Sequence, residues 1–174
     1  MMVSRPNCPL SCPSQADLDV LLRDGVDIMS VATPHPMQVA FGAVAHDGLF
    51  DPEINGSRWF AFEEPDADDL ILWRRQSDQT ASWSGHAFAL GQGMIDAAAT
   101  YAFDCALHIF ASPLDWLRAR RDGIVVLDWT RAFERLRDAP RIAIAQELLP
   151  LDRRHMKPAR MPELFVVPSR RRAA

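Results

Sequence analysis

Long apolar runs, cysteine and familiar catalytic motifs are scarce or missing in this sequence. No run approaches the roughly 20 apolar residues that a membrane-spanning helix needs. The opening stretch MMVSRPNCPLSCPS has one Arg and none of the apolar segment typical of a secretory signal. We therefore expect a cytoplasmic protein without membrane contact. With 174 residues, 48% of them hydrophobic and 24% charged, the chain has the composition of one globular domain.

Three cysteines, Cys8, Cys12 and Cys105, are too few for a disulfide framework. Cys8 and Cys12, with His35 and His46 downstream, offer the donors of a zinc site. Structural zinc sites usually have tight ligand pairs at both ends of a loop, which this spacing does not provide. We predict no metal there, and we interpret the proline-rich residues 1–13 as an irregular arm.

Standard catalytic motifs are also missing. The sequence has no Ser–His–Asp spacing, paired-carboxylate motif, P-loop or His-x-x-x-His pattern. Gly91-Gln92-Gly93 begins like a dinucleotide fingerprint, but its third glycine would fall at Asp96. A lone G-x-G at a strand end is more typical of a turn. These absences favour a binding protein over a standard enzyme.

Charge is unevenly distributed along the chain. Residues 1–70 carry three Arg against twelve Asp and Glu, a local balance of −9, whereas residues 71–174 have a balance of +5. Lys157 is the only lysine, and the other cations are Arg, whose planar fork suits phosphate and carboxylate groups. One interpretation of the acidic residues 1–70 is that the protein is an inhibitor whose surface mimics nucleic acid.

The basic part allows contact with nucleic acid or with an acidic protein, such as a protein of the nucleic-acid-handling machinery. The other interpretation is that these cations are solvated helix ends. The residues predicted to form the basic face are Arg118, Arg120, Arg121, Arg153, Arg154, Lys157 and Arg160.

Local patterns predict the elements of the N-terminal half. Ser14 has the position of an N-cap before a short amphipathic helix that ends near Gly25. Residues 28–31 and 37–44 predict short strands, and residues 49–57 predict a loop. Four β-type runs joined by polar turns then predict an antiparallel meander, at 58–64, 70–75, 81–85 and 86–91.

The sharpest pattern lies between Leu107 and Leu136. An apolar run at 107–110 is followed by Ser112-Pro113, which is typical of a helix N-terminus. The helix should end at Asp122-Gly123, and the continuous apolar run 124–127 predicts a buried parallel strand. A second helix should follow Asp128. We expect a right-handed strand–helix–strand unit, because that hand prevails in such crossovers.

The remaining patterns complete the predicted fold. The alanine-rich run after Gly93 predicts a helix through Phe103, residues 141–149 predict a helix ended by Pro150, and residues 163–168 predict a last strand. We expect a single α/β domain over 14–168, with α+β as the alternative, followed by a basic tail at 169–174.

Asp128 and Asp115 are the candidate catalytic residues. Asp128 follows the buried strand, at the edge where open α/β sheets collect their ligands. It could bind a divalent metal or a substrate hydroxyl, or it could only cap the next helix. Asp115, in a first helical turn, has the same two interpretations. A phosphoryl-transfer or nuclease-like site would need a second carboxylate, with Asp96 and Asp104 as candidates, and Mg²⁺ as its cofactor.

The strand–helix–strand order with an acidic tip over residues 107–137 resembles the core of the Toprim fold of primases and topoisomerases. That family has a Glu after the first strand and Asp-x-Asp after the second. This sequence has Ala111-Ser112 and Asp128-Trp129-Thr130 there, so only Asp128 matches. The resemblance implies metal-dependent phosphoryl transfer at a divergent or degenerate site.

Residues 83–167 as a whole are similar to uncharacterised bacterial proteins of accessory or mobile-element type. This resemblance implies an accessory role and supplies no activity. Our leading hypothesis from the sequence is a non-enzymatic binding or accessory protein, associated with the nucleic-acid-handling machinery of a mobile element. The Toprim-like enzyme and the acidic inhibitor are the alternatives.

Overall fold

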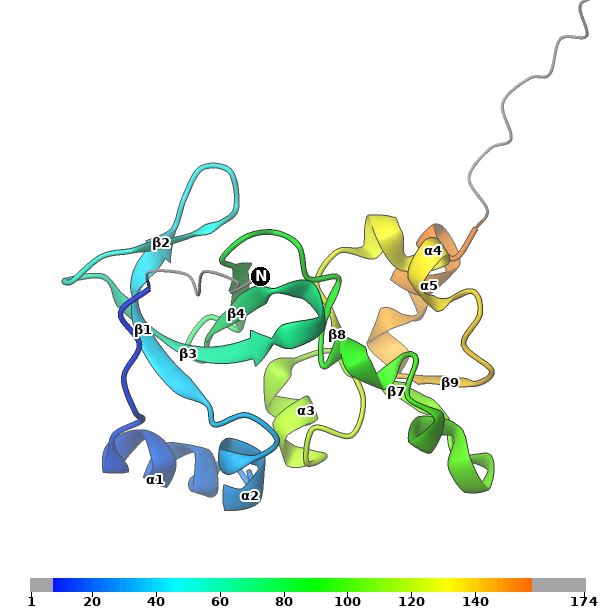
Figure 1. Cartoon of the computed structure of the whole chain (residues 1–174), viewed down its shortest axis with the longest axis horizontal. Coiled ribbons are helices and arrows are strands. Elements are labelled where there is room, and N and C mark those ends of the chain that lie inside the picture. The colour runs from blue at the N-terminus through cyan, green and yellow to red at the C-terminus, as the bar shows by residue number, and fades with distance from the viewer. Residues whose placement is uncertain (1–7, 158–174) are drawn as a thin grey trace, which may run out of the picture.

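A curled antiparallel sheet of five strands forms the first part of the molecule (Figure 1). The computed structural model describes residues 8–157. Along the sheet the strand order is β2-β1-β3-β4-β5. Leu49 forms a parallel bridge with Ser82, which brings the two outer strands toward each other. The strands are β1 (Gln38–Val44), β2 (Phe50–Pro52), β3 (Ser57–Glu64), β4 (Asp69–Arg74) and β5 (Gln79–Ser82).

Both faces of this sheet are buried. In β3, Trp59 and Ala61 point to one core while Phe60 and Phe62 point to another, as the two-residue period of a strand requires. The first core is closed by Cys8, Leu10 and Trp83, which pack against that face of the curled sheet. The second is covered by three helices, α1 (Gln15–Arg23), α2 (Ile28–Ala32) and α3 (Pro113–Arg118), which lie below the sheet in Figure 1.

The N-terminal helices show one correct and one wrong prediction. Ser14 caps α1 as predicted, in a capping box with Asp17. Residues 28–31, predicted as a strand, lie in helix α2 because the Asp27 carboxylate accepts a hydrogen bond from the Met29 amide at 2.9 Å. Part of the predicted irregular arm is paired, since Ser11 exchanges two backbone hydrogen bonds with Val39 of β1.

The second part of the molecule is built on two small sheets. Strand β7 (Leu107–Ile109) pairs in parallel with β9 (Ile142–Ile144), and β6 (Ala89–Leu90) pairs antiparallel with β8 (Val125–Val126). A parallel bridge between Ile109 and Ile124 joins them. Their side chains form a third core with α4 (Ala132–Leu136). The predicted strand, helix and strand between residues 107 and 127 are present, but β8 pairs antiparallel with β6, so the parallel strand predicted at 124–127 is limited to the bridge at Ile124.

Several predicted elements differ from the structure. The meander ends at β5, because β6 leaves it to pair with β8. Residues 50–52, predicted as loop, form strand β2 against β1. The alanine-rich run is two 3-10 helices, η2 (Gln92–Met94) and η3 (Ala98–Asp104), with left-handed backbone at Phe103 and Asp104.

The largest error concerns residues 141–149, which were predicted as a helix that Pro150 ends. The apolar residues 142–144 form strand β9, and Pro150 lies in the first turn of α5 (Leu149–His155). Proline is favoured there because the first helical amides need no intrahelical acceptor. The 3-10 helices η4 (Trp129–Arg131) and η5 (Gln146–Leu148) precede α4 and α5. The predicted strand at 163–168 and the basic tail lie outside the described residues.

The overall class is mixed α/β, as predicted. Between residues 8 and 157, no helix combines the length and apolar composition needed to cross a membrane.

Candidate functional site

A cavity of about 310 Å³ opens where the two parts of the molecule meet. Its walls come from the end of β3, the segment before β1, the Gly91–Met94 turn and the end of α3. Phe62, Trp116 and Met94 supply apolar surface, and Glu64 and Arg121 supply buried charge. This position, with side chains from four segments, makes the cavity the best candidate for a binding site among the described residues.

Arg121 is the most unusual residue of the cavity. It is only 9% exposed, and its guanidinium carbon lies 5.4 Å from the ring centre of Phe62 and 5.2 Å from that of Trp116. Its Nη1 donates a hydrogen bond to the His35 carbonyl at 2.9 Å, but Nε and Nη2 are buried and have no partner among the described residues. Burial lowers the pKa of Arg121 to about 10, with Glu64 opposing that shift, so the group remains charged at neutral pH.

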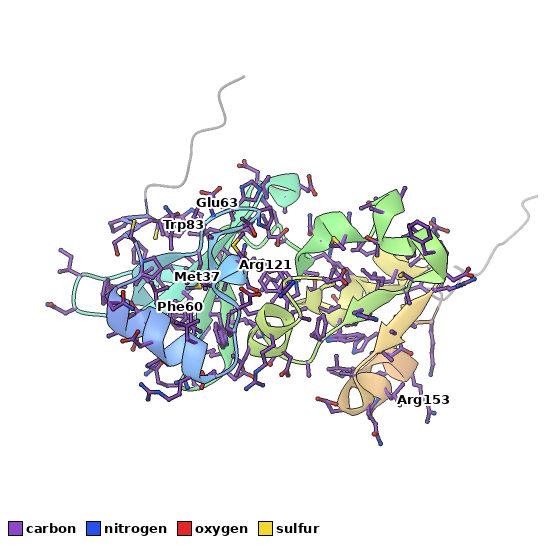
Figure 2. All side chains as sticks on the ribbon, turned by 90° about the horizontal axis from the view of Figure 1, so that it is seen from below. Met37, Phe60, Glu63, Trp83, Arg121 and Arg153 are labelled. Atoms are coloured by element: carbon purple, nitrogen blue, oxygen red, sulfur yellow. The ribbon has the colours of Figure 1, made fainter. Side chains whose placement is uncertain are left out.

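The backbone after α3 turns Arg121 inward. Arg120 and Arg121 have left-handed φ angles of 56° and 61°, a conformation that costs non-glycine residues roughly 1–2 kcal/mol each. The Arg121 amide donates to the Trp116 carbonyl at 2.9 Å, which closes the helix end. The sequence predicted a turn at Asp122-Gly123, and the structure places this unfavourable backbone just before it. Figure 2 shows Arg121 in the middle of the molecule as a result.

Glu64 is the second buried charge of the cavity. It is 5% exposed and accepts a hydrogen bond from the Gly91 amide through Oε1. Burial raises the pKa of Glu64 to about 7; the Gly91 and Gln92 amides and Arg121 oppose this rise, and Asp66 adds to it. Arg121 and Glu64 do not form an ion pair within 4 Å. Glu64 therefore titrates near neutral pH beside an arginine with unused donors.

Sequence reasoning missed Glu64, although a signal was available. In β3 it has the same parity as Phe60 and Phe62, so it points to the helix-covered face of the sheet. A carboxylate at a strand end that points to the same face as buried aromatic residues is a candidate for a perturbed pKa. Pro65 directly after it suggested only a turn.

The G-x-G segment forms a turn, as its pattern indicated. Gly91 has a φ of 77°, and a Cβ there would come within 2.6 Å of the Gly123 carbonyl oxygen. A Cβ at Gly93 would come within 2.6 Å of an Asp66 carboxylate oxygen. Between them, the buried Gln92 accepts a hydrogen bond from the Phe88 amide at 3.0 Å. The two glycines thus let the turn approach both α3 and the end of β3.

The predicted catalytic residues lie at helix N-termini, Asp128 as a cap and Asp115 in a first turn. Asp128 Oδ1 accepts hydrogen bonds from the Thr130 amide at 3.0 Å and the Thr130 hydroxyl at 2.5 Å. Asp115 lies in the first turn of α3, where it contacts the capping Ser112 hydroxyl at 2.9 Å and Arg118 at 3.1 Å. Both aspartates therefore have the capping and dipole roles that the sequence also allowed.

No metal cluster forms around these aspartates in the described part of the chain. Asp96 lines a separate polar hollow of about 460 Å³ with Arg131 and Arg135. Asp104 forms an ion pair with Arg141 at 2.8 Å. From residue 8 to residue 157, nowhere do three or more His, Cys, Asp or Glu side chains gather closely enough to hold a metal ion, and this includes the region of Cys8 and Cys12.

The predicted basic face is divided among different environments. Arg118 donates to the Asp24 carbonyl at 2.7 Å, Arg120 pairs with Asp27 at 2.9 Å, and Arg121 is buried. Arg153 and Arg154 of α5 are exposed, as is Lys157. Figure 2 shows Arg153 at an outer end of the molecule, well away from Arg121. Arg160 lies outside the described residues.

The acidic N-terminal part is likewise partly neutralised. Asp17 pairs with Arg58, Asp24 with Arg75 and Asp27 with Arg120. Glu64 and Asp69 are buried. Five of the twelve carboxylates of residues 1–70 are therefore unavailable as a continuous acidic surface.

Comparisons with models of protein families, with curated proteins and with solved structures find no match to this chain.

Proposed function

We propose that this protein is a non-enzymatic binding protein and that the cavity beside Arg121 is its binding site. The single observation that carries the proposal is a buried guanidinium lining a cavity with two nitrogens that have no partner among the described residues. A buried charged donor without an acceptor costs folding free energy, commonly several kcal/mol. Proteins retain such groups where a ligand uses them.

The lining of the cavity supports binding over catalysis. Its described lining residues include no hydroxyl, thiol or amine that could act as a nucleophile. Glu64 could exchange a proton near pH 7, but among the described residues no hydroxyl, thiol or amine nucleophile lines the cavity beside it. The Toprim-like alternative is less well supported, because Asp128 is engaged in capping.

A ligand screen by thermal shift tests this proposal. The panel contains small acids, amides, amines and neutral aromatic compounds, each measured with the native protein and with His35→Trp. His35 is exposed at the cavity mouth, so the larger ring should block entry without disturbing the core. We expect some compounds to raise the melting temperature of the native protein but not that of the variant. If no compound does so, the cavity is not a binding site.

A second candidate function is contact with nucleic acid as an accessory protein of a mobile element. The observation in its favour is the exposed Arg153, Arg154 and Lys157 at the α5 end, which form no ion pair with any residue from 8 to 157. A titration with duplex DNA at two salt concentrations tests it, because phosphate contacts weaken steeply with salt. Replacing all three cations with Gln should abolish that binding. Affinity that is absent or independent of salt would exclude this function.

A further inference from the structure

If the cavity is the binding site proposed above, its lining also indicates the chemistry of the ligand. We propose that the cavity binds a monocarboxylic acid with a small apolar body, whose carboxylate is held by Arg121 and by the protonated carboxyl group of Glu64.

Arg121 provides the anion-binding half of this site. Its Nη1 is occupied by the His35 carbonyl, and Nε and Nη2 are the donors without a partner among the described residues; both are enclosed, so a carboxylate reaches them when the guanidinium shifts toward the cavity. The guanidinium fork matches the two oxygens of a carboxylate. The rings of Phe62 and Trp116 lie against the guanidinium, and these cation–π contacts favour its charged state.

Glu64 provides the second half. The Gly91 amide donates to Oε1 and the Gln92 amide also favours the ionised form, so the proton that burial favours would sit on the other oxygen and be donated to an acceptor in the cavity. Burial favours the protonated form, and the pKa of about 7 means that this form is abundant at and below neutral pH. A protonated acid facing a carboxylate makes a charge-assisted hydrogen bond. The bound ligand should therefore keep a proton on Glu64.

The other charges around the cavity limit the ligand to one negative charge. Glu63 and Asp66 line the same cavity from β3 and from the segment after it, and His35 lies at the mouth from the segment before β1. The two carboxylates repel an anion, and they repel a phosphate dianion more strongly than a carboxylate. The volume of about 310 Å³ is at the small end for ligand pockets, and the Phe62, Met94 and Trp116 walls favour an apolar body.

Such a carboxylate can come from a free acid or from the C-terminus of a peptide. Calorimetric titration with 3-phenylpropionate and with N-acetyl-Ala-Phe distinguishes these sources, each against its own neutral amide. We expect at least one acid to bind, and to bind ten or more times more tightly than its amide. Equal affinity of acid and amide would overturn the assignment of the carboxylate.

The pH dependence identifies the role of Glu64. With a pKa of about 7, the protonated fraction falls from about 0.9 at pH 6 to about 0.1 at pH 8. The acid should therefore bind about tenfold more weakly at pH 8. Glu64→Gln keeps a neutral donor at both pH values, so its affinity should not depend on pH in this range. Binding to the native protein that is equal at both pH values would contradict the role of Glu64.

Substitutions of Arg121 complete the test. Arg121→Met should abolish acid binding, whereas the exposed Arg137→Met should leave it unchanged. If amides or amines bind to the native protein but not to His35→Trp, and acids do not bind, the carboxylate assignment fails and the proposed function survives. If nothing binds, both fail.

Discussion

The Gly91 amide donates a hydrogen bond to the carboxylate of Glu64, and this contact joins the end of β3 to the G-x-G turn of the second part of the molecule. It fixes one oxygen of a buried acid next to Arg121. The properties of the cavity, and the stability of the junction around it, depend on the protonation of this one group.

The first prediction concerns the pH dependence of stability. Because burial raises the Glu64 pKa from 4.5 to about 7, the folded state binds more protons than the unfolded state between these values. The free energy of unfolding should therefore decrease as pH rises through this window. From pH 5 to pH 8 the loss due to Glu64 is roughly 2–3 kcal/mol. Urea unfolding at both pH values should show this loss in the native protein and not in Glu64→Gln.

The second prediction is that Arg121→Met folds as well as the native protein. Replacing a buried, incompletely paired charge with an apolar residue of similar size is often neutral or stabilising. Met also fits between Phe62 and Trp116, where sulfur–aromatic contacts are favourable. We expect the free energy of unfolding to stay the same or to rise by up to about 4 kcal/mol. A loss of about 3 kcal/mol or more would mean that Arg121 supports the fold.

The third prediction concerns Asp69, the buried carboxylate at the start of β4. It accepts hydrogen bonds from the Leu70, Ser84, His86 and Ala87 amides and from the Ser82 hydroxyl. Asp69→Ala should reduce the free energy of unfolding by about 2–4 kcal/mol, because several buried donors lose their acceptor. Asp51→Ala, at an exposed position of β2, is the control.

The contribution of Asp69 to stability should also decrease at low pH. Burial alone would raise the pKa of Asp69, but hydrogen bonds from Ser82, Ala87 and Ser84 outweigh it and lower the pKa below 3.8. The stability that its ionised form contributes is present above the unfolded pKa and is lost as pH falls through the lower folded value. The gap in stability between the native protein and Asp69→Ala should therefore narrow below about pH 3.8.

The fourth prediction separates the two interpretations of Asp128. As a cap, it should tolerate Asn, which accepts the same hydrogen bonds, whereas Asp128→Ala should cost about 1 kcal/mol. Thermal unfolding of the native protein and both variants, with and without Mg²⁺, provides the measurement. A melting temperature that Mg²⁺ raises in the native protein and not in Asp128→Asn would instead support a metal site.

Local signals in the sequence predicted the caps and most strands correctly. Ser14 and Ser112 cap their helices, and the runs around Phe60 and Leu72 form neighbouring strands. These features depend on residues a few positions apart. The helix predicted over residues 142–144 was wrong because a short apolar run fits a helix or a strand equally well. Only pairing with β7 decides between the two.

The candidate site was harder to predict, because its residues come from distant parts of the chain. The sequence predicts Arg121 on a basic face that binds nucleic acid or an acidic protein, yet a left-handed turn directs it into the core. Asp122-Gly123 indicates a turn, but it does not indicate that the left-handed residues are Arg120 and Arg121, because neither is Gly, Asn or Asp. Glu64 was within reach through its parity in β3, but its partner Gly91 lies 27 residues away.

The bridge between Leu49 and Ser82 has a consequence for how this protein behaves at high concentration. Outer strands normally present unpaired amides and carbonyls to which another chain can add, the first step of edge-to-edge aggregation. Here Ser82 of β5 is paired with Ile71 on one side and bridged to Leu49 on the other, and Ser11 likewise pairs with β1. By curling its sheet until these segments meet, the chain occupies with its own backbone positions that a second molecule could otherwise use.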